Sequence, residues 1–150
     1  MTNPTQSDGI IVNETGAQRL LEYVLDVGQS DKMARCRLTV TDDHLNRHDS
    51  LHGGITSAVL DNAMGATASL TADATGRVPF MTISLNTQFL APARKGDQLT
   101  ATGKVVGGGK SIKFVEGQLL SADGRIIATA TGVFKRVPKH RLSDKDDSQS

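Results

Sequence analysis

The feature that most constrains the fold is a run from Gly54 to Leu70 in which only one side chain, that of Asp61, is charged. Apolar side chains recur along it at spacings of three and four residues, which is typical of one face of a helix. These side chains are Ile55, Val59, Ala63, Ala66 and Leu70. The other faces carry Ala, Gly, Ser and Thr, and a helix without a charged face has to be buried on most sides. The rest of the chain must therefore surround this helix.

The sequence after the helix predicts four strands, separated by Gly- and Pro-containing turns. The predicted strands are Phe80 to Phe89, Gln98 to Val106, Lys110 to Ser121, and Ile126 to Arg136. Before the helix, Arg19 to Val27 and Lys32 to Val40 are predicted to form a strand hairpin around the turn at 28–31. The fold class is therefore α+β, with one antiparallel sheet wrapped round a long central helix.

Length and charge indicate one soluble domain. A chain of 150 residues is sufficient for one core, and its net charge of +1 gives no reason to expect nucleic acid or a membrane surface as a partner. We expect a flexible segment at 1–18, the domain at 19–137 and a charged tail at 138–150. No apolar run reaches the ~20 residues of a membrane span. The single cysteine, Cys36, lies in an alternating segment, so we expect a buried thiol and a cytoplasmic protein.

The polar loop before the helix ends in His52-Gly53-Gly54. Glycine lacks a Cβ, so a ligand atom can approach the main chain closely there. The first N–H groups of a helix have no internal partner and lie at the positive end of the helix dipole. Donors fixed in this way stabilise a developing negative charge, as in an oxyanion hole. Asp61, nine residues after His52, is a carboxylate among small and apolar neighbours, which favours a catalytic role over a solvated one.

These residues carry a resemblance to a known family. Asn46, then His52-Gly53-Gly54, then Leu60-Asp61-Asn62-Ala63 resemble the signature of the hotdog-fold acyl-CoA thioesterases, in the branch related to phenylacetate degradation and 4-hydroxybenzoyl-CoA thioesterases. The similarity extends from about Leu20 to Val137. It implies the hotdog fold and hydrolysis of an aryl- or medium-chain acyl-CoA to a free acid and CoA.

The resemblance also implies roles. Asp61 would act as general base or nucleophile, and the Gly53 N–H would polarise the thioester carbonyl, with Gly54 as its backbone partner. His52 would orient the loop, and the Asn46 amide would lie near the thioester or the attacking water. Thr82 would hydrogen-bond that water, although Ser84 and Asn86 share its strand parity.

For the CoA portion, Gly109, Lys110 and Ser111 resemble the family segment that contacts the nucleotide phosphates. Weaker candidates for the same contact are Arg94, Lys95, Lys135 and Arg136. No cofactor is expected, because CoA is part of the substrate. No metal is expected either: His44 and His48 are predicted to be solvated loop residues, and a metal site needs three or four convergent ligands.

The spacing within the motif predicts a site shared between two chains. Nine residues of helix separate His52 from Asp61 by ~13 Å, whereas a reacting group has to come within about 3–3.5 Å of the carbonyl carbon. A two-fold dimer with antiparallel helices would place the start of each helix opposite the middle of the other. We therefore expect a homodimer or a homotetramer built as a dimer of dimers.

Two alternatives remain open from the sequence. One is an acyl-thioester hydratase or dehydratase of the same fold, whose site needs an Asp/His or Glu/His pair. The other is a non-catalytic acyl-CoA-binding protein. Known sensors of that kind add a DNA-binding segment, for which the residues before the first strand are too few and too polar.

Overall fold

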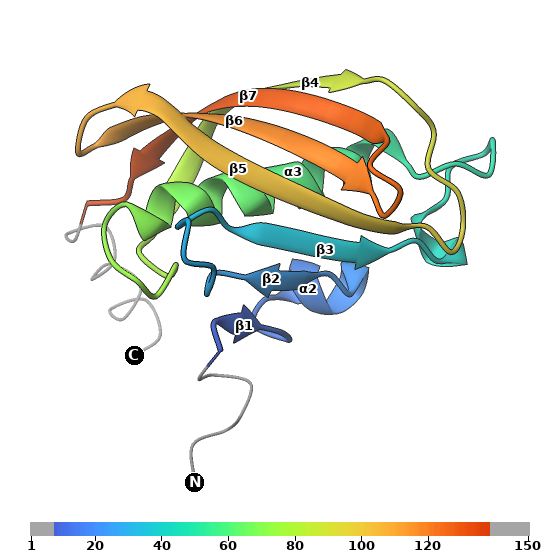
Figure 1. The fold of residues 1–150 in the computed structure, drawn as a ribbon, viewed down its shortest axis with the longest axis horizontal. Coiled ribbons are helices and arrows are strands. Elements are labelled where there is room, and N and C mark those ends of the chain that lie inside the picture. The colour runs from blue at the N-terminus through green and yellow to red at the C-terminus, as the bar shows by residue number, and fades with distance from the viewer. Residues whose placement is uncertain (1–7, 139–150) are drawn as a thin grey trace, which may run out of the picture.

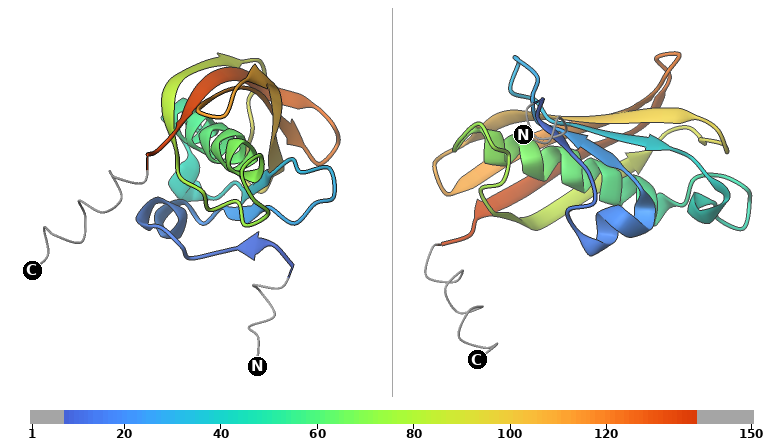
Figure 2. Two further views of the ribbon diagram at one scale, coloured as in Figure 1. Left: turned by 90° about the vertical axis from the view of Figure 1, so that its left-hand side faces the viewer. Right: turned by 90° about the horizontal axis from the view of Figure 1, so that it is seen from below.

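The computed structural model describes residues 8–138 and contains one long helix, α3, against one antiparallel sheet. The helix α3 covers Gly53–Leu70. The sheet has seven strands in the order β1-β2-β3-β5-β6-β7-β4 (Figure 1). Seen along α3, the strands curve round the helix (Figure 2), which confirms the predicted architecture. None of the helices in the described residues is long and apolar enough to cross a membrane.

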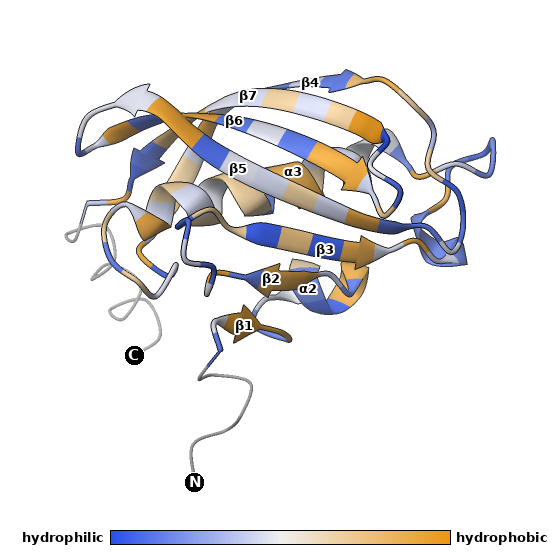
Figure 3. Cartoon of the chain, in the orientation of Figure 1, coloured by the Kyte–Doolittle hydropathy of each residue, from blue (hydrophilic) through white to orange (hydrophobic). Residues whose placement is uncertain are grey.

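The four strands after the helix lie close to where the sequence predicts them. They are β4 (Phe80–Phe89), β5 (Gln98–Gly108), β6 (Ile112–Ser121) and β7 (Ile126–Arg136). Hydrophobic and hydrophilic residues alternate along β5 and β6 (Figure 3), because one face of the sheet covers α3 and the other is exposed. The predicted strand start at Lys110 is wrong, since Gly108 adopts a φ of 105° and Lys110 lies in the turn before β6.

The N-terminal region differs most from the prediction. In place of one strand over 19–27, a short helix α2 (Gly16–Leu21) precedes strand β2 (Val24–Asp26). The Thr15 side chain caps this helix by accepting from the Gln18 N–H. The Gln18 side chain is buried and donates to the Ile11 and Tyr23 carbonyls, which ties the helix to both flanking strands. These local hydrogen bonds oppose the strand propensity of the segment.

Structure also begins before residue 19, where the domain was expected to start. Strand β1 (Ile10–Ile11) pairs with β2, and β2 in turn pairs with β3 (Arg35–Thr39), as the predicted hairpin requires. Segment 1–18 is thus partly built into the sheet. Its first seven residues and residues 139–150 of the predicted tail lie outside the described part of the chain.

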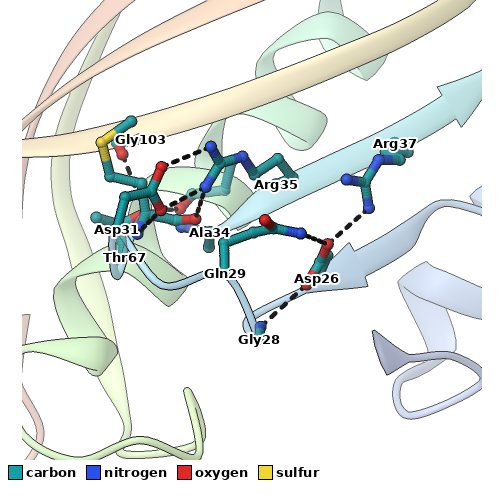
Figure 4. Close-up of polar contacts among 11 residues, drawn as sticks. Asp26, Gly28, Gln29, Asp31, Ala34, Arg35, Arg37, Thr67 and Gly103 are labelled. Atoms are coloured by element: carbon teal, nitrogen blue, oxygen red, sulfur yellow. Dashed lines mark hydrogen bonds and ion pairs between the residues drawn. The ribbon is translucent and has the colours of Figure 1, made fainter. Parts of the chain in front are cut away.

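A polar network holds the β2–β3 hairpin (Figure 4). The Asp26 carboxylate is buried and accepts from Arg37 at 2.9 Å, from Gln29 at 2.8 Å and from the Gly28 N–H at 3.0 Å. Nearby, Arg35 pairs with Asp31 at 2.6 Å. A buried carboxylate is stable only with such partners, so Asp26 is a structural residue of the hairpin.

The helix approaches the sheet closely because β5, β6 and β7 place glycines beneath it. A Cβ at Gly103 would lie 2.7 Å from Thr67 Oγ1 and 2.9 Å from Met64 Cα. At Gly117 it would lie 2.6 Å from Met64 Sδ, and at Gly132 3.1 Å from Met64 Cε. The three glycines therefore form a recess for the Met64 side chain and for one turn of α3.

We expect Gly103→Ala to lower the free energy of unfolding by about 1–3 kcal/mol, because the new methyl group meets helix backbone that cannot move aside alone. Chemical denaturation measures this change. Gly109→Ala is the matched control, since nothing lies within 4 Å of a Cβ at Gly109 and its φ is not positive. Equal stability of the two variants would contradict the close-approach argument.

Candidate active site

The loop before α3 is organised by Asn46. Its Oδ1 accepts from the His48 N–H at 2.9 Å and from the Ser50 N–H at 3.2 Å, and its own N–H donates to the Ser50 carbonyl at 2.7 Å. Asp49 adopts a φ of 58° in the same turn. Among the described residues the Asn46 Nδ2 has no acceptor, so the amide shapes the loop through its oxygen alone.

His52 caps the helix. Its Nδ1 accepts from the Gly54 N–H at 2.9 Å, and its own N–H donates to the His44 carbonyl at 2.9 Å. The Nδ1 atom of His52 therefore acts as the acceptor of this cap. The ring thus caps and orients the start of α3.

The cap distinguishes Gly53 from Gly54, because only one of the two N–H groups takes part in it. The Gly54 N–H is already bonded to His52, whereas the Gly53 N–H has no acceptor among the described residues. Gly53 lies in a pocket of about 350 Å³ together with Asn46 and Phe89. Of the two glycines, only Gly53 can therefore offer its N–H at the helix start to a ligand without breaking the cap.

The prediction that His44 is solvated is wrong. His44 is 2 % exposed, accepts from the Thr41 N–H through Nδ1 at 3.0 Å and meets the Leu21 carbonyl through Nε2 at 2.8 Å. It joins the end of α2 to the loop before α3 and supports the backbone that His52 contacts. His48 is exposed, as expected.

Asp61 and Thr82 lie together in a second pocket, of about 540 Å³. The Thr82 hydroxyl donates to Asp61 Oδ1 at 2.5 Å. Thr82 lies on the side of β4 that faces the helix, and a register shift between Thr82 and Ser84 turns Ser84 to the opposite side of the sheet. Of the three residues of equal parity, the structure therefore places Thr82 against the carboxylate. The remaining oxygen of Asp61 has no partner among the described residues.

The predicted residues thus form two groups on one protomer. Asn46 and Gly53 line the pocket at the start of α3, and Asp61 and Thr82 line the pocket at its middle. Gly109, Lys110 and Ser111 are exposed in the turn between β5 and β6 and line neither pocket. In residues 8–138 no three His, Cys, Asp or Glu side chains converge as a metal site would require.

Cys36 is buried in β3, as expected, and burial raises the pKa of its thiol to about 12. It is therefore no candidate nucleophile. Sequence reasoning missed Tyr23, which is 4 % exposed and donates to Asn62 Oδ1 at 3.0 Å. The Asn62 Nδ2 also donates to the Ala58 carbonyl. Both the oxygen and the nitrogen of this amide, in the residue after Asp61, are therefore hydrogen-bonded. No sequence motif marks a pair that lies 39 residues apart.

The described residues thus combine a long helix whose first N–H is unpaired, a carboxylate at mid-helix and an antiparallel sheet that curves round the helix. The family model described as "Thioesterase superfamily" matches residues 48–128. The chain belongs to this family, and it is a thioester hydrolase.

The chain is similar to several known proteins. Acyl-coenzyme A thioesterase 13 of Homo sapiens is 29 % identical over 133 residues, which are 85 % of this chain and 93 % of that protein. The Bacillus halodurans protein BH2602, solved with CoA, superposes with a TM-score of 0.72 at 26 % identity, over 85 % of this chain and 82 % of that one. The PaaI protein of E. coli, from the phenylacetic acid degradation operon, has the same fold, with a TM-score of 0.71 at 23 % identity over 83 % and 86 % of the two chains.

We expect His52→Ala to lower the free energy of unfolding by about 1 kcal/mol, because the Gly54 N–H loses its cap. Thermal or urea denaturation measures the loss. His52→Asn is the informative control, since an Asn side chain caps helices well and should restore most of the stability. If Asn restores nothing, the ring does not act as a cap.

Proposed function

We propose that this protein hydrolyses acyl-CoA thioesters at a site shared by two protomers. Asp61 of one protomer acts on the thioester as general base or as nucleophile, and the Gly53 N–H of its partner holds the developing oxyanion. The observation that carries the proposal is the pairing of a free Gly53 N–H with a Thr82-bound Asp61 in two separate pockets. The human relative named as an acyl-CoA thioesterase and the CoA-bound bacterial structure support CoA as the thiol.

The proposed reaction needs only the thioester and water as reactants. The water oxygen bonds to the carbonyl carbon, directly or after an Asp61 acyl intermediate, and the carbon–sulfur bond breaks. The carbonyl oxygen gains negative charge in the transition state, where a fixed N–H at a helix start stabilises it most. The departing CoA thiolate takes up a proton, and the products are a free acid and CoA.

The exposed edge of the sheet supports the dimer. Strand β4 is the last strand in the sheet order, so one of its sides has no neighbouring strand among the described residues. Ten residues of open edge form a natural template for a second copy. The adjacent face of α3 is only partly covered in the protomer and carries Ser57, Ala58, Asp61, Asn62 and Gly65. Small residues let a second helix approach closely, and a two-fold axis would then bring each Gly53 towards the partner's mid-helix.

We place the binding site for the CoA phosphates at the turn between β5 and β6. Lys110 is exposed there, and the backbone N–H of Arg136 donates to the Ser111 carbonyl at 2.7 Å. Two basic residues are thus placed at one end of the sheet, where either can pair with a phosphate group as a point charge.

The experiment that tests the reaction is thiol release from a panel of aryl- and straight-chain acyl-CoAs. We expect Asp61→Ala to lower kcat by about 100-fold or more, because the reacting carboxylate is lost. Thr82→Val should cost less, since it removes only one hydrogen bond to Asp61. Glu116→Ala, an exposed carboxylate on β6, is the control and should retain wild-type turnover. Unchanged turnover in Asp61→Ala would refute the assignment.

Gly53→Pro tests the donor and the shared site together. Proline is well tolerated at the first helical position and removes only the N–H there, so we expect a folded protein with kcat lowered by about 10²–10³. Gly53→Ala keeps the N–H and adds the same Cβ near Phe89, so it is the matched control.

When the Gly53→Pro and Asp61→Ala variants are denatured and refolded together, about a quarter of wild-type turnover should return. Half of the dimers are then mixed, and each mixed dimer holds one intact site out of two. No recovery, with mixed dimers demonstrated, would place the whole site within one protomer.

A further inference from the structure

The pocket at the start of α3 is bounded on one side by the segment that follows β4. The Leu90 and Ala91 N–H groups both donate to the Ile127 carbonyl, at 2.9 Å and 3.1 Å, which holds this segment against β7. The Leu51 N–H donates to the Ala93 carbonyl at 2.9 Å and joins the segment to the loop before α3. Hydrogen bonds thus fix the two walls of the pocket relative to each other.

Most of the residues that line this pocket are apolar. Leu51, Ala93 and Ile127 are buried and form its inner part. Phe89 and Leu90 also line it, but they are 60 % and 59 % exposed, and only one large apolar side chain in residues 8–138 is more exposed. Two adjacent apolar side chains in water are unfavourable, so this wall favours contact with an apolar group.

The Phe89 ring lies directly beside Gly53. A Cβ at Gly53 would lie 3.3 Å from Phe89 Cε1, 3.5 Å from Cζ and 3.9 Å from Cδ1, so the ring lies against the first residue of the helix. In the proposed reaction the Gly53 N–H holds the thioester oxygen at a hydrogen-bond distance of about 2.9 Å. The carbonyl carbon is bonded to that oxygen, so the acyl chain begins in the pocket that Phe89 lines.

We infer that Phe89 is a specificity-determining residue whose ring packs against an apolar acyl group longer than acetyl. The inference rests on the proposed function and adds to it the polarity of the acyl group and a residue that selects it. An acetyl group ends at the carbon next to the carbonyl and covers little of the ring. An alkyl or phenyl group beyond that carbon covers the ring and continues over Leu90, which extends the same apolar wall.

The composition of the pocket favours an apolar acyl group over other parts of a thioester substrate. The pantetheine arm of CoA carries amide groups, which lose hydrogen bonds to water when they are placed against apolar side chains. None of the described residues that line the pocket is charged, so a carboxylate on the acyl group would be desolvated there without a cation. A hydrocarbon chain or ring has neither cost.

The test measures kcat/KM for acetyl-CoA, hexanoyl-CoA and phenylacetyl-CoA by thiol release in the full-length protein. We expect the wild type to prefer the two larger thioesters. Phe89→Ala should lower kcat/KM for both about tenfold, the effect of losing apolar contact with roughly half of a phenyl ring. The value for acetyl-CoA should change less than about twofold, because acetyl contacts little of the ring. Phe89→Leu keeps an apolar side chain and should retain most of the preference.

Phe114→Ala is the matched control, because Phe114 is also an exposed phenylalanine, at 46 %, but lies on β6 and does not line this pocket. Its preference among the three thioesters should equal that of the wild type. An equal loss for all three thioesters in Phe89→Ala would place the ring against the pantetheine arm and overturn the inference. A wild type without a preference would overturn it as well.

The oligomeric state of Phe89→Ala separates substrate contact from subunit contact, because Phe89 is the last residue of the open strand β4. We expect the same mass as the wild type by size-exclusion chromatography with light scattering. A smaller mass would place the ring in the subunit interface and overturn the inference while leaving the thioesterase assignment intact. Thiol release that persists in Asp61→Ala would instead refute the proposed function.

Discussion

The close packing of α3 on the sheet is the interaction on which the other features depend. Gly103, Gly117 and Gly132 lie beneath the helix. The helix backbone and Thr67 approach Gly103, and the Met64 side chain approaches Gly117 and Gly132. Larger residues there would push the helix away from β5, β6 and β7. The Thr82 hydroxyl could then no longer reach Asp61 at 2.5 Å, because it is carried by the neighbouring strand β4. The hydrogen bond between Thr82 and Asp61 therefore depends on the distance between helix and sheet.

The start of α3 is fixed by a separate set of hydrogen bonds. His52 accepts the Gly54 N–H, the His44 carbonyl accepts the His52 N–H, and the His44 ring is itself buried between Thr41 and Leu21. The chain thereby uses two histidine side chains to order a loop. The result is a helix N-terminus with one N–H satisfied and the preceding one, that of Gly53, left for an electron-rich atom.

In the proposed mechanism the two pockets act together across a dimer. Each would supply one half of the groups that cleave the thioester, and about two turns of helix separate Gly53 from Asp61 within one chain. The open edge of β4 and the small residues on the adjacent face of α3 lie between them. A carboxylate in mid-helix is costly to bury fully, and the partly exposed position of Asp61 avoids that cost in the isolated protomer.

The sequence by itself determined the fold class, the long helix, the four C-terminal strands and the identity of Asp61, Gly53 and His52 as the residues to examine. It could do so because helical and strand periodicities are local and the motif is contiguous in the chain. It could not determine that His44 is buried, that residues 16–21 form a helix, or which residue of β4 meets Asp61. Each of these depends on side-chain hydrogen bonds that no sequence periodicity indicates: His44 with Leu21, Gln18 with Ile11, and Thr82 with Asp61. Only the tertiary structure brings those groups together, since hydrogen bonds across 7 to 23 residues leave no periodic trace in the sequence.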